Sequence, residues 1–168
     1  LRTESFVRLT VHCSHEKMTR KQRMRSSFID KAEQTILKVL DEVKPELMTA
    51  FGNIDFVTKE DKTVVTHLDK MVETELRKAL KNLDSNIGIV GEELGAEGSK
   101  DTYWLVDPID GTESFIRGIP NCKNLFALMH NGEPIWAMAN YFARDELWTA
   151  RKDEGVLQVK DLSEKCRI

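Results

Sequence analysis

Cysteine is scarce in this sequence, and its placement argues against a disulfide framework. The three cysteines, Cys13, Cys122 and Cys166, are odd in number and far apart, and no C-x-x-C pair occurs. This usage is typical of proteins from a reducing compartment. We therefore expect a cytoplasmic protein that folds around an apolar core rather than around covalent links.

Long apolar runs and internal repeats are also missing. No window approaches the roughly 18 consecutive apolar residues that a membrane helix needs, and no repeat or low-complexity tract occurs. We therefore expect no membrane partner. The 168 residues, 40% of them hydrophobic, are enough for one domain with a sizeable core.

The body of the chain lacks the excess of positive charge that nucleic acids attract. Residues 1–28 carry seven Lys and Arg residues against two acidic ones, which leaves 18 basic and 26 acidic residues in the rest. That remainder has a net charge of −8, which argues against nucleic-acid binding. It is compatible with the binding of metal cations.

The N-terminal segment differs in composition from the rest. The first residue is Leu1 rather than Met, and residues 1–27 are basic, rich in Ser and Thr and poor in acidic residues. This composition resembles an organelle transit segment, which would make the protein organellar. The alternative is a disordered leader, or upstream sequence that precedes a true start at Met18 or Met24.

Two helices are expected in the first half of the chain. From Phe28 onward, apolar residues recur at steps of three and four, and this spacing predicts a helix that ends near Gly52. Pro45 is expected to kink or interrupt that helix. After a polar loop over residues 54–65, Thr66 is the expected N-cap of a second helix, with Asp69 three residues on.

The second half of the chain has the period of strands. Apolar runs predict strands over residues 87–91, 102–107, 125–130, 134–142 and 146–150, and Asn131-Gly132 predicts a hairpin turn. Short turns between strands favour antiparallel pairing. The sequence therefore predicts an α+β fold in layers, with two N-terminal helices packed on a mostly antiparallel sheet. The three tryptophans are expected in its core.

Acidic residues gather at predicted strand ends and helix starts. They form three clusters, namely Asp69, Glu92-Glu93, and Asp107 with Asp110. Carboxylates brought together in this way repel one another unless a divalent cation binds them, and an all-oxygen ligand set selects Mg²⁺, Mn²⁺ or Ca²⁺ over zinc. Each cluster alone also has a plainer interpretation as turn chemistry, helix capping or a solvated pair.

The stretch WLVDPIDGTESF, residues 104–115, joins two of these features. Pro108 would fix a turn in which the Asp107 and Asp110 carboxylates converge with the carbonyl of Ile109, after the strand ends. Gly111 would allow close backbone approach, and residues 112–116 would begin a helix whose N-terminus attracts an anion. A metal beside a helix N-terminus is a site for phosphate.

Together these segments resemble the inositol monophosphatase family of Mg²⁺-dependent, lithium-sensitive phosphatases. The resemblance rests on VVTHLD (64–69), IVGEELG (89–95) and WLVDPIDGTESF (104–115), with ELWTARKDEG further on, and covers roughly residues 28–160. The combination of G-E-E with W-x-V-D-P-I-D-G-T is far more specific than any single piece.

The resemblance implies a set of metal ligands. Glu92 and Asp107 look like ligands of a first Mg²⁺. Asp107 and Asp110 look like ligands of a second Mg²⁺, assisted by the Ile109 carbonyl. Glu93 would lie near a third, weaker site or support the ligands from outside.

The resemblance also implies a reaction. Thr112, paired with Asp69, looks like the group that orients and activates the attacking water, and Glu92 belongs to the same catalytic set. Asp110, Gly111 and Thr112 look like the contacts to the substrate. The family's reaction is in-line attack of a metal-bound hydroxide on a phosphomonoester, without a phosphoenzyme. Inositol monophosphate is the first choice of substrate, with histidinol phosphate or a nucleoside bisphosphate as alternatives.

One departure from the family pattern concerns length. Family members are longer, and their second half supplies a further aspartate ligand in a Trp-Asp motif that does not occur here. Residues 28–168 are therefore expected to be the metal-binding domain without its C-terminal partner domain. The chain could be an active phosphatase, a truncated homologue that binds metal weakly or pairs with a full-length partner, or a fragment that does not fold. An uncovered sheet face favours a homodimer.

Overall fold

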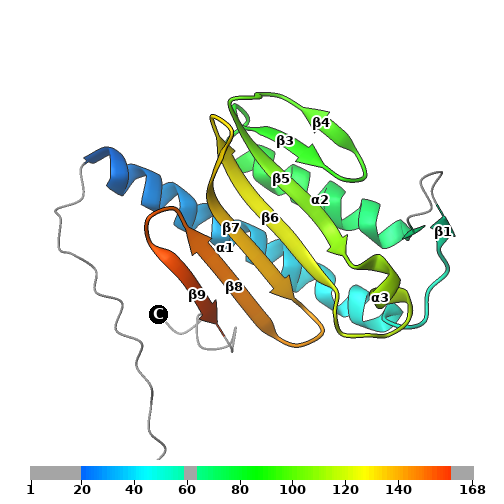
Figure 1. Ribbon diagram of the computed structural model, residues 1–168. Helices are drawn as coiled ribbons and strands as arrows, with labels where there is room; N and C mark the ends of the chain where they lie inside the picture. Colours follow the sequence, from blue (N-terminus) through cyan, green and yellow to red (C-terminus); the bar gives the residue numbers. More distant parts are fainter. Residues whose placement is uncertain (1–19, 59–63, 160–168) are drawn as a thin grey trace, which may run out of the picture.

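A computed structural model describes residues 20–58 and 64–159, and Figure 1 shows two long helices behind one face of a seven-stranded sheet. The α+β prediction is thus confirmed. The sheet order is β4-β3-β5-β6-β7-β8-β9, and β1 and β2 form a separate pair. The elements are α1 (Arg20–Ala50), β1 (Val57–Thr58), β2 (Val64–Val65), α2 (His67–Leu83), β3 (Gly88–Gly91), β4 (Gly95–Glu97), β5 (Thr102–Asp110), α3 (Thr112–Ile116), β6 (Lys123–His130), β7 (Glu133–Tyr141), β8 (Glu146–Arg151) and β9 (Gly155–Val159).

Helix α1 is longer than the sequence suggested. It begins at Arg20, so residues 20–27 of the predicted leader are helical, because Arg, Lys, Gln and Met are strong helix formers. Pro45 does not interrupt the helix, which continues to Ala50. Leu47 in this last turn is buried, and such packing outweighs the hydrogen bond lost at proline. Residues 1–19 lie outside the described residues.

Helix α2 begins as predicted. Thr66 is its N-cap, and its hydroxyl accepts from the Leu68 N–H at 3.2 Å while Asp69 accepts from the Thr66 N–H at 2.8 Å. This reciprocal capping fixes the first turn, and therefore the position of the Asp69 carboxylate. The polar loop predicted over residues 54–65 contains the short antiparallel pair of β1 and β2, and residues 59–63 between them lie outside the described residues.

The sheet is antiparallel except where β3 pairs with β5 in parallel. Asn131 and Gly132 both have positive φ, 50° and 79°, as the predicted hairpin turn requires. Two strands of this sheet, β4 and β9, were not predicted, and neither was the separate pair of β1 and β2. β4 has three residues, all exposed, and so carries no alternation of buried and exposed positions.

Strand β5 differs from its prediction at the most important point. It does not end at Asp107 but continues to Asp110, with a shift of register between these residues. Pro108 and Ile109 are buried within the shift, where a proline is tolerated because no ladder N–H is needed. The two aspartates therefore lie on an irregular strand end rather than in a loop.

The two faces of the sheet differ. The closed face, formed by Trp104, Val106, Phe126, Leu128, Trp136 and Met138, packs on the helices. The Trp104 ring stacks on Phe28 of α1 at 6.4 Å and meets the Trp136 ring edge-on at 6.0 Å. The open face carries Leu105, Leu125, Ala127, Ala137, Ala139, Trp148 and Ala150 in register across β5 to β8. Trp148, expected in the core, is 36% exposed there.

Candidate active site

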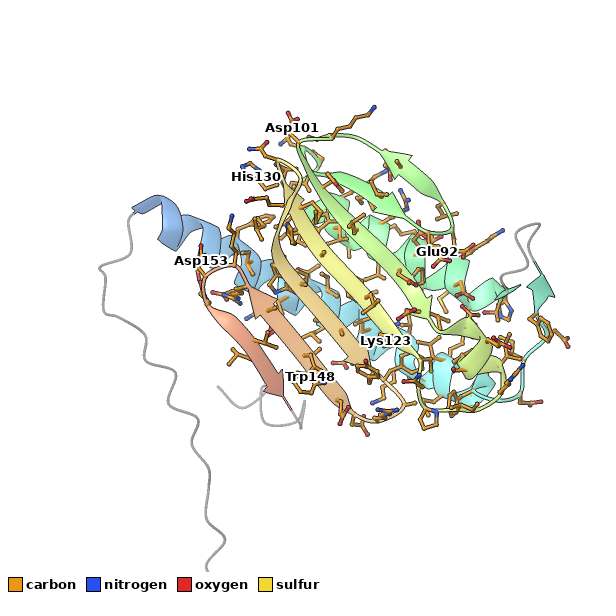
Figure 2. All side chains as sticks on the ribbon, in the orientation of Figure 1. Glu92, Asp101, Lys123, His130, Trp148 and Asp153 are labelled. Atoms are coloured by element: carbon orange, nitrogen blue, oxygen red, sulfur yellow. The ribbon has the colours of Figure 1, made fainter. Side chains whose placement is uncertain are left out.

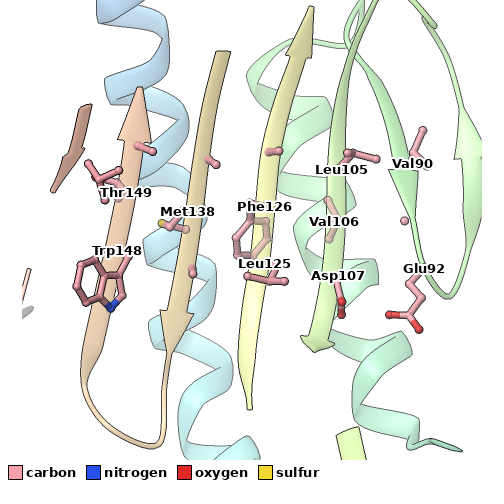
Figure 3. Close-up of a pocket in the computed structure, with 16 residues that line it drawn as sticks. Val90, Glu92, Leu105, Val106, Asp107, Leu125, Phe126, Met138, Trp148 and Thr149 are labelled. Atoms are coloured by element: carbon pink, nitrogen blue, oxygen red, sulfur yellow. The ribbon is translucent and has the colours of Figure 1, made fainter. Parts of the chain in front are cut away.

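The predicted site residues come from four elements that meet at one end of the sheet. Asp69 lies in the first turn of α2, Asp107 and Asp110 at the end of β5, and Thr112 at the start of α3. Glu92 follows β3, and its N–H donates to the Val106 carbonyl at 3.1 Å. Because β3 and β5 run parallel, the Glu92 and Asp107 side chains leave the sheet together, as Figure 3 shows.

Asp107 is the electrostatic centre of this group. Burial raises its pKa from 3.8 to about 7, and the charge and hydrogen bond of Glu92 and the charges of Asp110 and Asp69 act in the same direction. Four predicted carboxylates therefore influence one another. The buried Oδ1 atom of Asp107 has no hydrogen-bond partner in the protein.

Asp69 and Thr112 lie side by side, as the family resemblance implied. The Thr112 hydroxyl is 2.9 Å from the Ile109 carbonyl oxygen and 3.4 Å from Asp69 Oδ1. Asp69 is also held by the N–H and hydroxyl of Thr66. Burial raises the pKa of Asp69 despite these hydrogen bonds, and the nearby charge of Glu93 adds to the increase.

The turn that carries Glu92 is held by a buried carboxylate that the sequence did not reveal. Glu73 of α2 accepts from the N–H groups of Glu93 at 2.8 Å and Leu94 at 3.2 Å, and from Arg77 Nε at 2.8 Å. A Cβ atom on Gly91 would lie only 1.9 Å from Glu73 Oε1. The glycine is therefore required by the close approach of this carboxylate.

Asp110 makes an ion pair with Lys123, its register partner on β6. Burial lowers the pKa of Lys123, but the hydrogen bond and charge of Asp110, with smaller contributions from Tyr141 and Asp107, raise it overall. Figure 2 labels Lys123 at the same end of the sheet as Glu92. Sequence reasoning missed this lysine, which precedes a predicted strand and belongs to no motif.

The irregular end of β5 is supported from behind by two amides. Asn124 Nδ2 donates to the Pro108 carbonyl at 2.6 Å, and Asn140 Nδ2 donates to Asn124 Oδ1 at 2.9 Å. Both asparagines are buried, at 0% and 4% exposed. This amide chain links β7 through β6 to the residue between the two aspartates.

Gly111 connects the strand to α3 in a left-handed conformation, with φ of 84°. A Cβ atom there would lie 2.9 Å from the Asn121 carbonyl oxygen, so both the backbone angle and the space favour glycine. Its carbonyl accepts from the Phe115 N–H at 3.0 Å. Thr112 therefore enters α3 directly after the aspartates, as predicted.

The donor set suits a hard cation. Across residues 20–58 and 64–159, no three His, Cys, Asp or Glu side chains are already grouped closely enough to hold a metal ion. The carboxylates of Glu92, Asp110 and Asp69 interact electrostatically with Asp107, and a cation would have to draw them closer together. The unpartnered Asp107 oxygen and the all-oxygen chemistry fit Mg²⁺ or a similar ion, which satisfies buried carboxylates without protonating them.

Comparisons with known proteins agree with this fold. Residues 24–165 match the model of the inositol monophosphatase family, and the chain belongs to that family. A histidinol-phosphatase of Mycobacterium tuberculosis is 35% identical over 121 residues, which cover 70% of this chain and 46% of the relative.

Solved structures show the same architecture. An IMPase of Thermotoga maritima matches with a TM-score of 0.69 and 29% identity over 77% of this chain and 51% of its own. An IMPase/NADP phosphatase solved with Mg²⁺ and phosphate matches with a TM-score of 0.65 and 24% identity over 77% of this chain and 50% of its own. The chain thus spans about half the length of the relatives it matches.

No helix among the described residues is long and apolar enough to cross a membrane.

Proposed function

We propose that this chain carries the metal-binding part of a Mg²⁺-dependent phosphatase that hydrolyses a small phosphomonoester. The observation that carries the proposal is the buried, unpartnered Oδ1 of Asp107, beside Glu92 and within the electrostatic influence of Asp110 and Asp69. A buried carboxylate oxygen without a donor is costly unless a cation binds it. Family membership supports the same chemistry.

The metal ligands in this proposal are Glu92, Asp107, Asp110 and the carbonyl of Ile109. Bound Mg²⁺ supplies positive charge for the phosphate oxygens and lowers the pKa of a coordinated water. Glu92 and Asp107 leave neighbouring strands on the same side (Figure 3) and interact electrostatically, which supports a shared cation. Glu93, whose N–H is held by Glu73, would support a weaker outer site.

The chain's own proton acceptor is the pair of Thr112 and Asp69. The Thr112 hydroxyl has one hydrogen and can give it to Asp69 Oδ1, 3.4 Å away, instead of to the Ile109 carbonyl. Its lone pairs then accept from an attacking water and orient that water toward phosphorus. Thr66 holds Asp69 in place through two hydrogen bonds.

The substrate contacts in this proposal are Asp110 and the backbone N–H groups of Gly111 and Thr112. Inositol monophosphate is our first choice, because it is the substrate for which the family is named. Relatives named as a histidinol-phosphatase and an IMPase/NADP phosphatase keep histidinol phosphate and nucleotide phosphates as alternatives. Cytoplasmic location is proposed, with an organelle as the alternative if the basic N-terminal segment is a transit peptide.

A second candidate function is a metal-binding chain that acts by pairing with another chain. The open face favours it, because a hollow of about 710 Å³ lies over Leu105, Ala127 and Trp148, which are apolar (Figure 3). Apolar surface of this extent is typical of an interface. We propose a homodimer through this face, and sedimentation velocity with and without a full-length homologue would separate it from mixed pairing.

The test of the phosphatase proposal is hydrolysis of inositol 1-phosphate, histidinol phosphate and an aryl phosphate, with Mg²⁺ and with EDTA. It should be run on this chain and on any longer product of the same gene. Asp107→Asn should abolish Mg²⁺-dependent turnover, whereas Asp101→Asn, which removes the same charge at the other end of β5, should leave it unchanged. Absence of metal-dependent turnover in both forms would discard the proposal.

A further inference from the structure

Lys123 holds one of the proposed metal ligands in a fixed arrangement. Its side chain is only 20% exposed and forms an ion pair with Asp110, the residue opposite it across β5 and β6. The pairing resumes at these two residues directly after the register shift. The backbone pairing therefore holds the Lys123 ammonium next to Asp110. A lysine on an unpaired segment would form this contact only part of the time.

Lys123 supplies a positive charge of the protein's own to the acidic site. Among the side chains that the structure describes, it makes the only ion pair of Asp69, Asp107 or Asp110, and its charge also attracts Asp107. An ammonium and a divalent cation next to the same carboxylate repel each other. Both therefore cannot occupy Asp110 at low cost.

The ammonium that pairs with Asp110 also contacts an aromatic ring. The Tyr141 ring on β7 is 5.4 Å from Lys123 Nζ, within the range of a cation–π contact. Loss of the Asp110 ion pair would therefore leave the ammonium with the Tyr141 ring as a partner. Arg144 lies over the same ring at 5.4 Å, but its Nε donates to the Pro120 carbonyl.

We propose that Lys123 is a built-in competitor for Mg²⁺ at Asp110, and that it weakens metal binding until the ion displaces it toward Tyr141. This inference rests on the proposed metal site. A partly exposed ion pair and the repulsion of a neighbouring divalent charge together correspond to about tenfold in affinity. Lys123→Met removes the charge and keeps the apolar length of the side chain.

The experiment is a calorimetric titration of the purified chain with MgCl₂ and, separately, MnCl₂. Lys123→Met should bind both ions about tenfold more tightly than the wild type, and Lys123→Gln provides the same test if the Met variant does not fold. Lys123→Arg, which keeps the charge, should bind as the wild type does. Arg144→Met removes an equal charge from the same ring and should change the affinity by less than about twofold.

The outcomes separate this inference from the proposed function. Metal binding by the wild type with no gain in Lys123→Met overturns the competition and leaves the metal site standing. An equal gain in Arg144→Met also overturns it, because the effect would then be general electrostatics. No binding by any variant removes the metal site, and the competition with it. Binding by Lys123→Met alone supports the competition most strongly.

Discussion

The closed and open faces of the sheet are built from alternate residues of the same strands, yet they have different roles. The closed face buries Trp104, Val106 and Phe126 against two helices, and this apolar packing stabilises the fold. The open face leaves Leu105 and Trp148 exposed and places Asp107 in the same cross-strand row as Leu125. Adjacent residues of β5 therefore have different roles, since Val106 packs in the core and Asp107 belongs to the candidate site.

The largest expected effect comes from a matched pair of tryptophans on the two faces. Trp104→Ala should lower the free energy of unfolding by about 3–5 kcal/mol, because the ring is fully buried between Phe28 and Trp136. Trp148→Ala, on the open face, should cost less than about 1 kcal/mol. Urea unfolding followed by circular dichroism measures both, and similar losses would contradict the division of the faces.

The next effect concerns the support of the Glu92 turn. Gly91→Ala should destabilise the protein by about 2–3 kcal/mol, because its Cβ would collide with the Glu73 carboxylate and displace it from Arg77. Thermal unfolding would report the loss. A variant as stable as the wild type would mean that Glu73 does not occupy this position. Glu73→Gln, which retains the shape, should lose less.

A pH dependence should follow from Asp107 in metal-free protein. Its pKa in the folded chain is about 7, above the ordinary value of 3.8, so its contribution favours folding fully below about pH 4 and is lost as the pH rises through 7. After a discount for partial exposure, the loss should be about 1–2 kcal/mol. Asp107→Asn should flatten this part of the stability profile, measured by urea unfolding from pH 4 to 8.

The smallest effect should come from Leu105, and its neighbour Val106 provides the matched comparison. Leu105→Ser on the open face should change the free energy of unfolding by less than about 0.5 kcal/mol while reducing the binding of a hydrophobic dye. Val106→Ser on the closed face should cost several times more, because that side chain is 3% exposed. A reversed order would show that the open face is covered in solution.

Local chemistry explains what could be predicted from the sequence. Thr66 with Asp69, and Asn131 with Gly132, carry their structure in adjacent residues, so the start of α2 and the hairpin were found. The acidic clusters could be singled out because each follows an apolar or β-branched run, and the parallel pairing of β3 and β5 brings Glu92 and Asp107 to the same end of the sheet.

What could not be predicted depends on long-range pairing. Lys123 reaches Asp110 only because β6 resumes its register after the irregular end of β5. In the sequence, Glu73 is one charged helix residue among several. Its role becomes clear only in the fold, where α2 packs beneath the turn at Glu93. The short strand β4 has no periodic pattern and depends on β3 for its pairing. These features become visible only once the chain is folded.

The positions of Asp107 and Asp110 depend on the buried amides of Asn124 and Asn140 as well as on the aspartates themselves. Each amide donates one hydrogen bond, from Asn140 on β7 to Asn124 on β6, and from Asn124 to the Pro108 carbonyl. Neither a carboxylate nor an aliphatic side chain of the same size supplies that donor. A homologue that retains every acidic residue but loses either amide would keep the ligands and lose their alignment, so an inventory of acids alone misjudges which chains preserve the site.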